Sequence, residues 1–100
     1  MNIQKTAGEF VRRYNLETSV ESRYIDLVSE VGEFGKEILN GNNYGKSNLH
    51  PTENMVQELG DVIFSLACIA NTLKLDMEEC VLAALEKYKK RYEKSGEVGS

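Results

Sequence analysis

Apolar side chains recur every three or four residues along most of this chain, and this spacing constrains the fold more than any other feature of the sequence. Such spacing places the apolar side chains of a segment on one face of an α-helix, whereas no segment alternates apolar and polar residues as a half-buried strand does. Helices are therefore predicted at about residues 3–14, 19–40, 51–73 and 76–95. Because the connections are short, apart from a polar loop over residues 40–52, we expect an all-α fold, an antiparallel bundle of about four helices.

The length and the helix signals indicate one domain. One hundred residues suffice for a single modest core. Asp76, followed by Glu79 three residues later, forms a capping-box pattern with Asp in place of Ser or Thr, and Gly96 is typical of the end of the last helix. We therefore expect one helical domain over residues 1–95 and a frayed tail over residues 96–100.

Three glycines inside the predicted helices indicate more than a simple monomer. Gly32, Gly35 and Gly60 each cost roughly 1 kcal/mol of helix stability relative to alanine. Gly35 lies within the apolar stripe of its helix, so we expect another helix to approach very closely there. The helices are also rich in apolar residues for so small a bundle. We therefore expect a homo-oligomer, either a homodimer or a dimer of dimers.

The composition indicates a globular chain. Its net charge of −4 gives no basic footprint for nucleic acid, and no apolar run approaches the roughly 20 residues of a membrane-spanning helix. The N-terminus lacks the apolar core of a signal peptide. Cys68 and Cys80 lie in apolar helical patterns without a CxxC spacing, which indicates two buried thiols in an intracellular chain. We therefore expect a cytoplasmic protein without nucleic-acid or membrane partners.

Two of the predicted helices each carry a pair of carboxylates inside an otherwise apolar run. Glu30 and Glu33 lie in the second helix, and Glu58 and Asp61 lie in the third. Residues three apart share a helix face, so each helix can aim two carboxylates at one spot. Four carboxylates that meet repel one another unless a cation lies between them. Such a ligand set suits Mg²⁺, for which Mn²⁺ can substitute, whereas di-iron and zinc sites would need histidine and the only one, His50, lies in the loop.

Chance must be weighed against this interpretation. Sixteen acids among 100 residues give about 2.5 acidic pairs at this spacing by chance, and the chain contains three, of which the Asp76 pair already serves as a helix cap. The positions of the acids on their helices are more informative. Glu58 lies only about 40° around the helix from the apolar stripe. A solvated acid usually has a lysine four residues further on, and neither Glu30 nor Glu58 has one. A metal site is the favoured interpretation, with ordinary surface acids as the alternative.

The acidic motifs also resemble those of a known family. Glu30-Val-Gly-Glu33, a gap of 24 residues and Glu58-Leu-Gly-Asp61-Val-Ile-Phe are similar to the ExxE–ExxD signature of the MazG-like nucleoside triphosphate pyrophosphohydrolases. Further matches follow in the same order, at Ala70-Asn71, at residues 75–79, and at Lys87 and Arg91. The resemblance therefore covers about residues 20–92.

The resemblance implies a fold, an activity and a site. It implies an all-α oligomer whose substrate is a nucleoside triphosphate, (d)NTP. The enzyme would hydrolyse this substrate to the (d)NMP and pyrophosphate, and one cellular role would be nucleotide-pool housecleaning. The four acids would hold Mg²⁺ against the phosphates, and Glu33 is our choice for the residue that accepts the proton of the attacking water, with Glu30 as the second catalytic carboxylate. The substrate-binding candidates are Lys87 and Arg91, and on weaker grounds Lys36 and Asn71.

Two other functions remain open at this stage. A phosphoribosyl-ATP pyrophosphohydrolase resembles this fold and chemistry but acts on a different nucleotide. A non-catalytic helical interaction module would use the same acids only for solubility, and Lys87 and Arg91 would then form a solvated basic face near a helix C-terminus, where cations are favoured.

Overall fold

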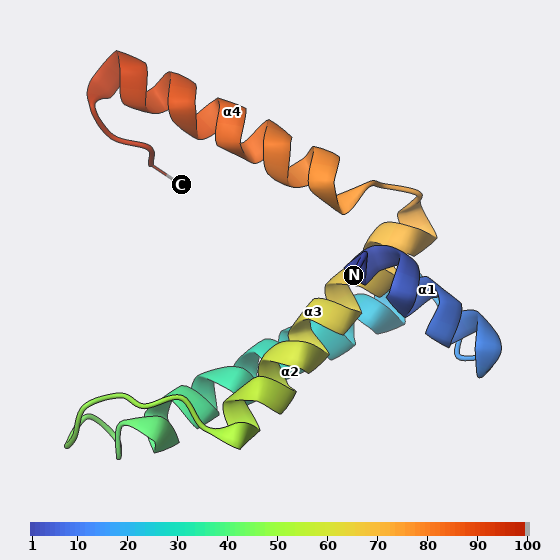
Figure 1. Cartoon of the computed structure of the whole chain (residues 1–100), viewed down its shortest axis with the longest axis horizontal. Coiled ribbons are helices and arrows are strands. Elements are labelled where there is room, and N and C mark those ends of the chain that lie inside the picture. The colour runs from blue at the N-terminus through green and yellow to red at the C-terminus, as the bar shows by residue number, and fades with distance from the viewer. Residues whose placement is uncertain (100) are drawn as a thin grey trace.

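The computed structural model describes residues 1–99, which form four α-helices and no strand (Figure 1). The elements in chain order are α1 (Ile3–Arg13), α2 (Val20–Gly41), α3 (Glu53–Leu73) and α4 (Met77–Ser95). The expected all-α fold is therefore confirmed. Gly96 ends α4 in a left-handed conformation with φ 78°. The expected division into a domain and a tail stays a prediction, and Ser100 at the end of that tail lies outside the described residues.

Each helix begins at a side chain that accepts a hydrogen bond from the backbone N–H three residues further on. This interaction satisfies a donor that the first turn of a helix otherwise leaves without a partner. At α4 the Asp76 carboxylate accepts from the N–H of Glu79 at 2.9 Å, which confirms the predicted cap. The N-cap residues are Asn2, Ser19, Thr52 and Asp76.

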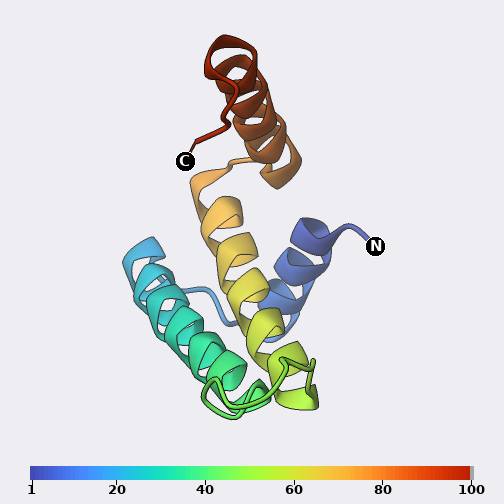
Figure 2. The ribbon, with the colours of Figure 1, turned by 90° about the vertical axis from the view of Figure 1, so that its left-hand side faces the viewer.

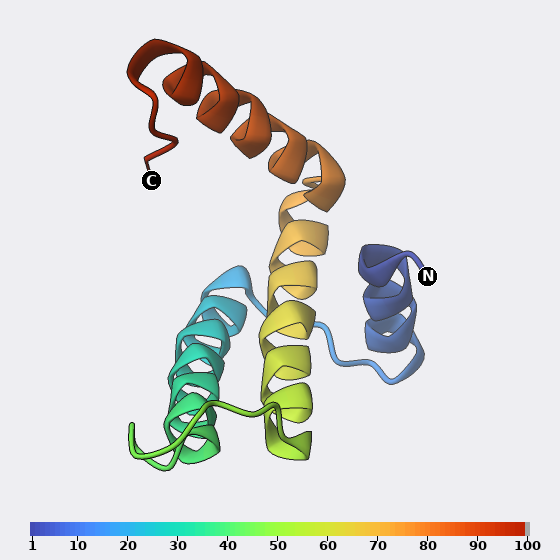
Figure 3. The same cartoon turned by 60° about the vertical axis from the view of Figure 1, so that its left-hand side comes forward.

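α3 is the helix around which the core is arranged. α2 runs antiparallel to it along much of its length, and α1 packs against its C-terminal half (Figure 3). The buried residues of α3 are mostly small, including Ala67 and Cys68. The ring of Phe64 packs edge to face against the ring of Phe10 on α1, with 6.1 Å between the ring centroids. By length and mean hydropathy (1.2) α3 would also pass as a membrane span, but it packs against two helices and carries two of the acids. These contacts fit a core helix, and the absence of a membrane partner stays a prediction.

α4 departs from the expected bundle. It leaves α3 at a turn over residues 74–76 and extends away from the other helices (Figures 1 and 2), and among the described residues only α2 with α3 and α1 with α3 pack along one another. Its apolar stripe is therefore exposed, with Leu85 at 54%. Cys80 is exposed as well, so the prediction of two buried thiols is wrong for Cys80 and right for Cys68. One chain leaves the predicted bundle incomplete.

The close helix approach predicted at Gly35 is absent from a single chain. A Cβ added at Gly35 would meet no atom within 4 Å across the described residues, because α3 packs against another flank of α2. Close approaches occur instead at Gly41, where an added Cβ would overlap the side chain of Met55 on α3, and at Gly8, where it would lie 3.1 Å from Nδ2 of Asn71. Glycine at this position allows α1 to lie against the end of α3.

Candidate metal centre

The packing of α2 against α3 brings together three of the four predicted metal ligands. Glu30 and Glu33 lie one turn apart on α2, and Glu58 lies on the facing turn of α3. One carboxylate oxygen from each of the three lies within 4.8 Å of the other two. Asp61 lies one turn beyond Glu58 and adds its charge to the same place, since it is the strongest charged neighbour raising the pKa of Glu30. We call these four residues the acidic cluster.

The acidic cluster holds negative charge that the surrounding side chains do not neutralise. Glu30 and Glu58 are partly buried, and the Oε2 atom of each is buried without a hydrogen-bond partner. Across residues 1–99 the only ion pair joins Lys90 and Glu86 on α4, at 4.0 Å. A buried anionic oxygen without a partner is costly, so the cluster is suited to a cation.

The pKa values of Glu30 and Glu58 lie above the usual range of a glutamate. Partial burial is the largest cause for both carboxyls, because it disfavours the charged form. The charges of Asp61 and Glu33 follow for Glu30, and those of Glu33, Asp61 and Glu30 follow for Glu58. The neighbouring carboxylates therefore make it harder for Glu30 and Glu58 to ionise, as expected where a cation is needed.

The donor atoms fit a hard divalent cation. Glu30, Glu33 and Glu58 offer carboxylate oxygens, the ligands that Mg²⁺ and Mn²⁺ prefer, and the group contains neither histidine nor cysteine. Mg²⁺ usually keeps several waters and takes few protein ligands, which leaves positions for the oxygens of a substrate.

One acidic residue near the cluster escaped the sequence analysis. Asp26 lies one turn before Glu30 on α2 and contributes, as the smallest of the causes, to its raised pKa. The signal that could have identified Asp26 is its spacing, because residues four apart on a helix face the same way and like charges there repel.

The predicted substrate-binding residues are not brought to the acidic cluster within one chain. Lys87 and Arg91 lie on α4, which points away from the pair of helices that carries the acids (Figure 1). Lys36 is exposed on α2, one turn beyond Glu33. Asn71 lies near the end of α3, where its Nδ2 donates to the backbone oxygen of Gln4 at 3.1 Å. The roles of these four residues stay predictions.

Comparison with known families identifies the domain. The model of the MazG nucleotide pyrophosphohydrolase domain matches residues 18–95. The chain belongs to this family. In this MazG domain the match takes in all of α2, α3 and α4, and therefore both acidic pairs. Membership implies nucleotide pyrophosphohydrolase activity in general terms, in a family that is typically metal-dependent.

A curated relative is similar over most of both chains. The uncharacterized protein YpjD of Bacillus subtilis (strain 168) is 30% identical over an alignment of 92 positions, which covers 89% of this chain and 78% of that protein. No solved structure gives a significant match to the chain. The family assignment therefore rests on the MazG domain match and on this relative.

The raised pKa values predict how the stability of the metal-free MazG domain depends on pH. A carboxyl whose pKa is higher in the folded than in the unfolded chain contributes stability that is fully present below the unfolded value, 4.5, and is lost as the pH rises through the folded value. We expect the melting temperature in EDTA to rise as the pH falls from about 7 to about 5. The double variant Glu30→Gln/Glu58→Gln should show a smaller rise in melting temperature than the control Glu9→Gln, in which an exposed glutamate is replaced. Equal pH profiles would contradict the prediction.

Proposed function

We propose that this chain is a Mg²⁺-dependent nucleoside triphosphate pyrophosphohydrolase, which converts a (d)NTP and water to the (d)NMP and pyrophosphate. The observation that carries the proposal is the acidic cluster, in which Glu30, Glu33 and Glu58 present oxygens to one point without a basic partner. An acidic pocket repels a triphosphate until divalent cations bridge the two. The proposed setting is the cytoplasm, where such an enzyme would clear unwanted nucleotides from the pool.

The four residues of the acidic cluster would hold the cation. Glu30 and Glu58 are partly buried, whereas Glu33 and Asp61 are exposed. When Mg²⁺ is bound it polarises the phosphoryl oxygens, offsets the charge of the leaving pyrophosphate and acidifies water beside it. Glu33 is exposed at the rim and is the residue that accepts the proton of the attacking water, with Glu30 as the second catalytic carboxylate.

The reaction needs one bond to form and one to break. The water oxygen attacks the α-phosphorus, the bond from that phosphorus to the oxygen bridging to the β-phosphorus breaks, and the proton passes to Glu33. Lys36 lies one turn from Glu33 with an exposed side chain and can reach a phosphate oxygen. Lys87 and Arg91 are one turn apart on α4 and would contact the triphosphate. Asn71 lines a 210 Å³ pocket between α1, α2 and α3, and we assign it to recognition of the nucleoside.

The surface of a single chain supports the proposal of a homo-oligomer. A folded monomer of 11.3 kDa typically exposes about 5,700 Å², whereas this chain exposes 7796 Å². The difference, about 2,000 Å² per chain, exceeds the roughly 800 Å² that each partner buries in an interface of standard size. Exposed apolar side chains supply such an interface on α4, with Val81, Leu82 and Leu85 each more than half exposed. We therefore propose a homodimer or a dimer of dimers.

Product analysis tests the proposed reaction. The purified protein is incubated with Mg²⁺ and a panel of canonical and modified dNTPs and NTPs in ¹⁸O-labelled water, with EDTA as the control. We expect monophosphate and pyrophosphate only with Mg²⁺, and we expect the label in the monophosphate because water attacks the α-phosphorus. The panel also includes phosphoribosyl-ATP, and hydrolysis of this compound alone would identify the chain as the related phosphoribosyl-ATP pyrophosphohydrolase. If no nucleotide is hydrolysed and Mg²⁺ leaves the melting temperature unchanged, the interaction module is the better account.

A further inference from the structure

The first turn of α1 is tied to the turn between α3 and α4 by one side chain, Gln4. Its Nε2 donates to the backbone oxygen of Leu75 at 2.6 Å, and its Oε1 accepts from the backbone N–H of Met77 at 2.8 Å. The amide thus pairs with both residues that flank Asp76, the N-cap of α4. At the same place Asn71 donates to the backbone oxygen of Gln4. A glutamine suits this position because it offers a donor and an acceptor on one planar group.

These hydrogen bonds have no counterpart among the described residues. Every other hydrogen bond that a side chain makes within residues 1–99 joins residues no more than seven positions apart, whereas those of Gln4 span 67 to 73 positions. α4 packs along none of the other described helices. Within one chain the direction of α4 therefore depends on the turn at residues 74–76 and on what holds that turn.

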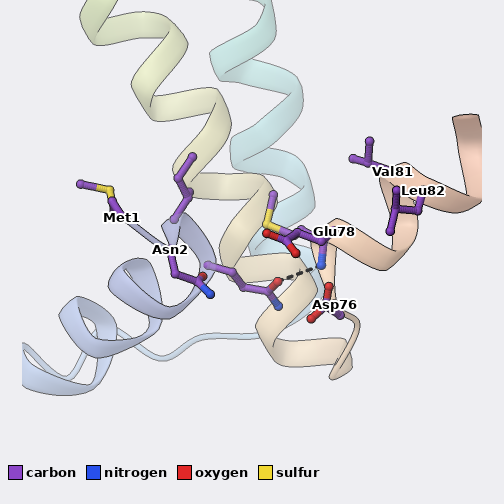
Figure 4. A pocket seen from close by; sticks show the side chains of 9 residues that line it. Met1, Asn2, Asp76, Glu78, Val81 and Leu82 are labelled. Carbon is purple, nitrogen blue, oxygen red and sulfur yellow. Dashed lines mark hydrogen bonds between the residues drawn. The ribbon is translucent and has the colours of Figure 1, made fainter.

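An open cleft lies beside the turn that leads into α4. A cleft of about 430 Å³ separates the start of α1 from the start of α4. In Figure 4 Met1 and Asn2 lie on one side of this cleft, and Val81 and Leu82 lie on the other. Backbone hydrogen bonds, such as that from the N–H of Leu75 to the oxygen of Ala70 at 2.9 Å, shape the turn itself. The hydrogen bonds of Gln4 are what join this turn to α1.

We propose that Gln4 is a positioning residue that fixes the direction of α4 and, through it, the places of Lys87 and Arg91. The inference rests on the proposed function and on the proposed oligomer, because α4 points away from the acidic cluster of its own chain and its two cationic residues would contact a triphosphate held at the cluster of a partner chain. Lys87 lies ten residues beyond Met77, about 15 Å along the helix, so a rotation of about 20° at the turn moves it by about 5 Å. A displacement of that size separates a cationic side chain from a phosphate oxygen.

A distance measurement tests the structural half of this proposal without activity. Spin labels are placed at Glu21→Cys on α2 and Glu93→Cys on α4, in a Cys80→Ser background that leaves buried Cys68 unlabelled. Labelled chain is diluted with unlabelled chain so that distances within one chain are read. We expect Gln4→Met, which has the same length but no amide, to broaden or shift the distance distribution. The matched exposed control Gln57→Met should leave the distribution unchanged.

A second variant covers the case in which Gln4→Met does not fold. Met77→Pro removes the N–H that donates to Gln4 together with the half-buried Met77 side chain, and Met77→Ala, which keeps the N–H, is its control. Proline is well tolerated at the first position of a helix, and Asp76 already has the extended conformation that a following proline requires. The proline ring displaces the Gln4 amide, so the same change in distance is expected. Distributions that match the parent in both variants would overturn the proposal.

Kinetics test the functional half. Gln4→Met should raise the KM for the nucleotide about tenfold with a smaller effect on kcat, since contacts to the triphosphate are lost. The rise in melting temperature caused by Mg²⁺ should be unchanged, because the acidic cluster lies on α2 and α3. A changed distance with an unchanged KM would overturn the link to substrate binding. If the parent protein hydrolyses no nucleotide, the proposed function fails, while the distances still decide whether Gln4 fixes α4.

Discussion

Replacing Glu58 with glutamine is expected to lower Mg²⁺-dependent nucleotide hydrolysis by more than about 100-fold and to raise the melting temperature of the metal-free chain. The loss follows from the position of Glu58, which contributes one of three oxygens that lie within 4.8 Å of one another. Replacing a residue that only orients a metal ligand lowers metal affinity or activity about 10- to 100-fold. Replacing a ligand itself should lower activity further.

The gain in stability has the same origin as the loss of activity. Glu58 is partly buried, its Oε2 lacks a hydrogen-bond partner, and burial together with Glu33 and Asp61 raises its pKa. At neutral pH a neutral amide of the same shape removes this repulsion. Function and metal-free stability are therefore expected to change in opposite directions at this position, as is usual where an active site stores unfavourable charge.

Three measurements on Glu58→Gln check this prediction. Steady-state hydrolysis gives the loss of activity, thermal unfolding in EDTA gives the stability, and unfolding with added Mg²⁺ gives metal binding. The exposed acid Glu9 supplies the matched control, because Glu9→Gln makes the same chemical change on α1. Activity that survives in Glu58→Gln, or a Mg²⁺ response equal to that of the parent, would rule out the metal centre at this cluster.

The second large effect is expected from Leu85→Glu on α4. This substitution should weaken self-association by about 30- to 1,000-fold, since a residue at the centre of an interface can contribute about 2–4 kcal/mol. Leu85 lies in the apolar stripe of α4 and is 54% exposed in one chain. A carboxylate there would have to be buried without a partner when two chains meet. The nucleotide hydrolysis should fall with the oligomer, because α4 would then lack a surface to pack on.

Sedimentation and light scattering of Leu85→Glu, read beside the activity, check the second prediction. Ala83→Glu is the matched control, because it introduces the same side chain on an exposed position of the opposite face of α4. We expect the parent and Ala83→Glu to share one oligomeric state and Leu85→Glu to be monomeric. A parent protein that is monomeric at micromolar concentration would refute the proposed oligomer.

Much of the local structure was predictable because its causes are local. The helix bounds follow from apolar spacing and from caps such as Asp76, whose side chain interacts only three residues away. The pairing of Glu30 with Glu33, and of Glu58 with Asp61, follows from helix geometry in the same way. The resemblance to the MazG-like family, now confirmed, also rested on these short motifs.

Errors arose where a residue was judged by its own helix alone. Cys80 lies in an apolar pattern, and the pattern predicts burial only if another helix covers that face. In one chain α4 has no such neighbour, so the thiol is exposed. Gly35 was expected to mark a close helix contact, yet the space beside it is open within the described chain. Amphipathic spacing shows which face can be buried but does not identify the surface that buries it.

The sequence by itself determined the four helices, the cap at Asp76, the family and the faces on which the acids lie, because these depend on residues within about one helical turn of each other. Only the tertiary structure decided that Glu30, Glu33 and Glu58 meet at one point, that their buried oxygens lack partners and that α4 points away from them. It also revealed the hydrogen bonds of Gln4 to the turn before α4. These features depend on contacts between residues far apart in the chain, and the spacing of side chains within one helix contains no information about them.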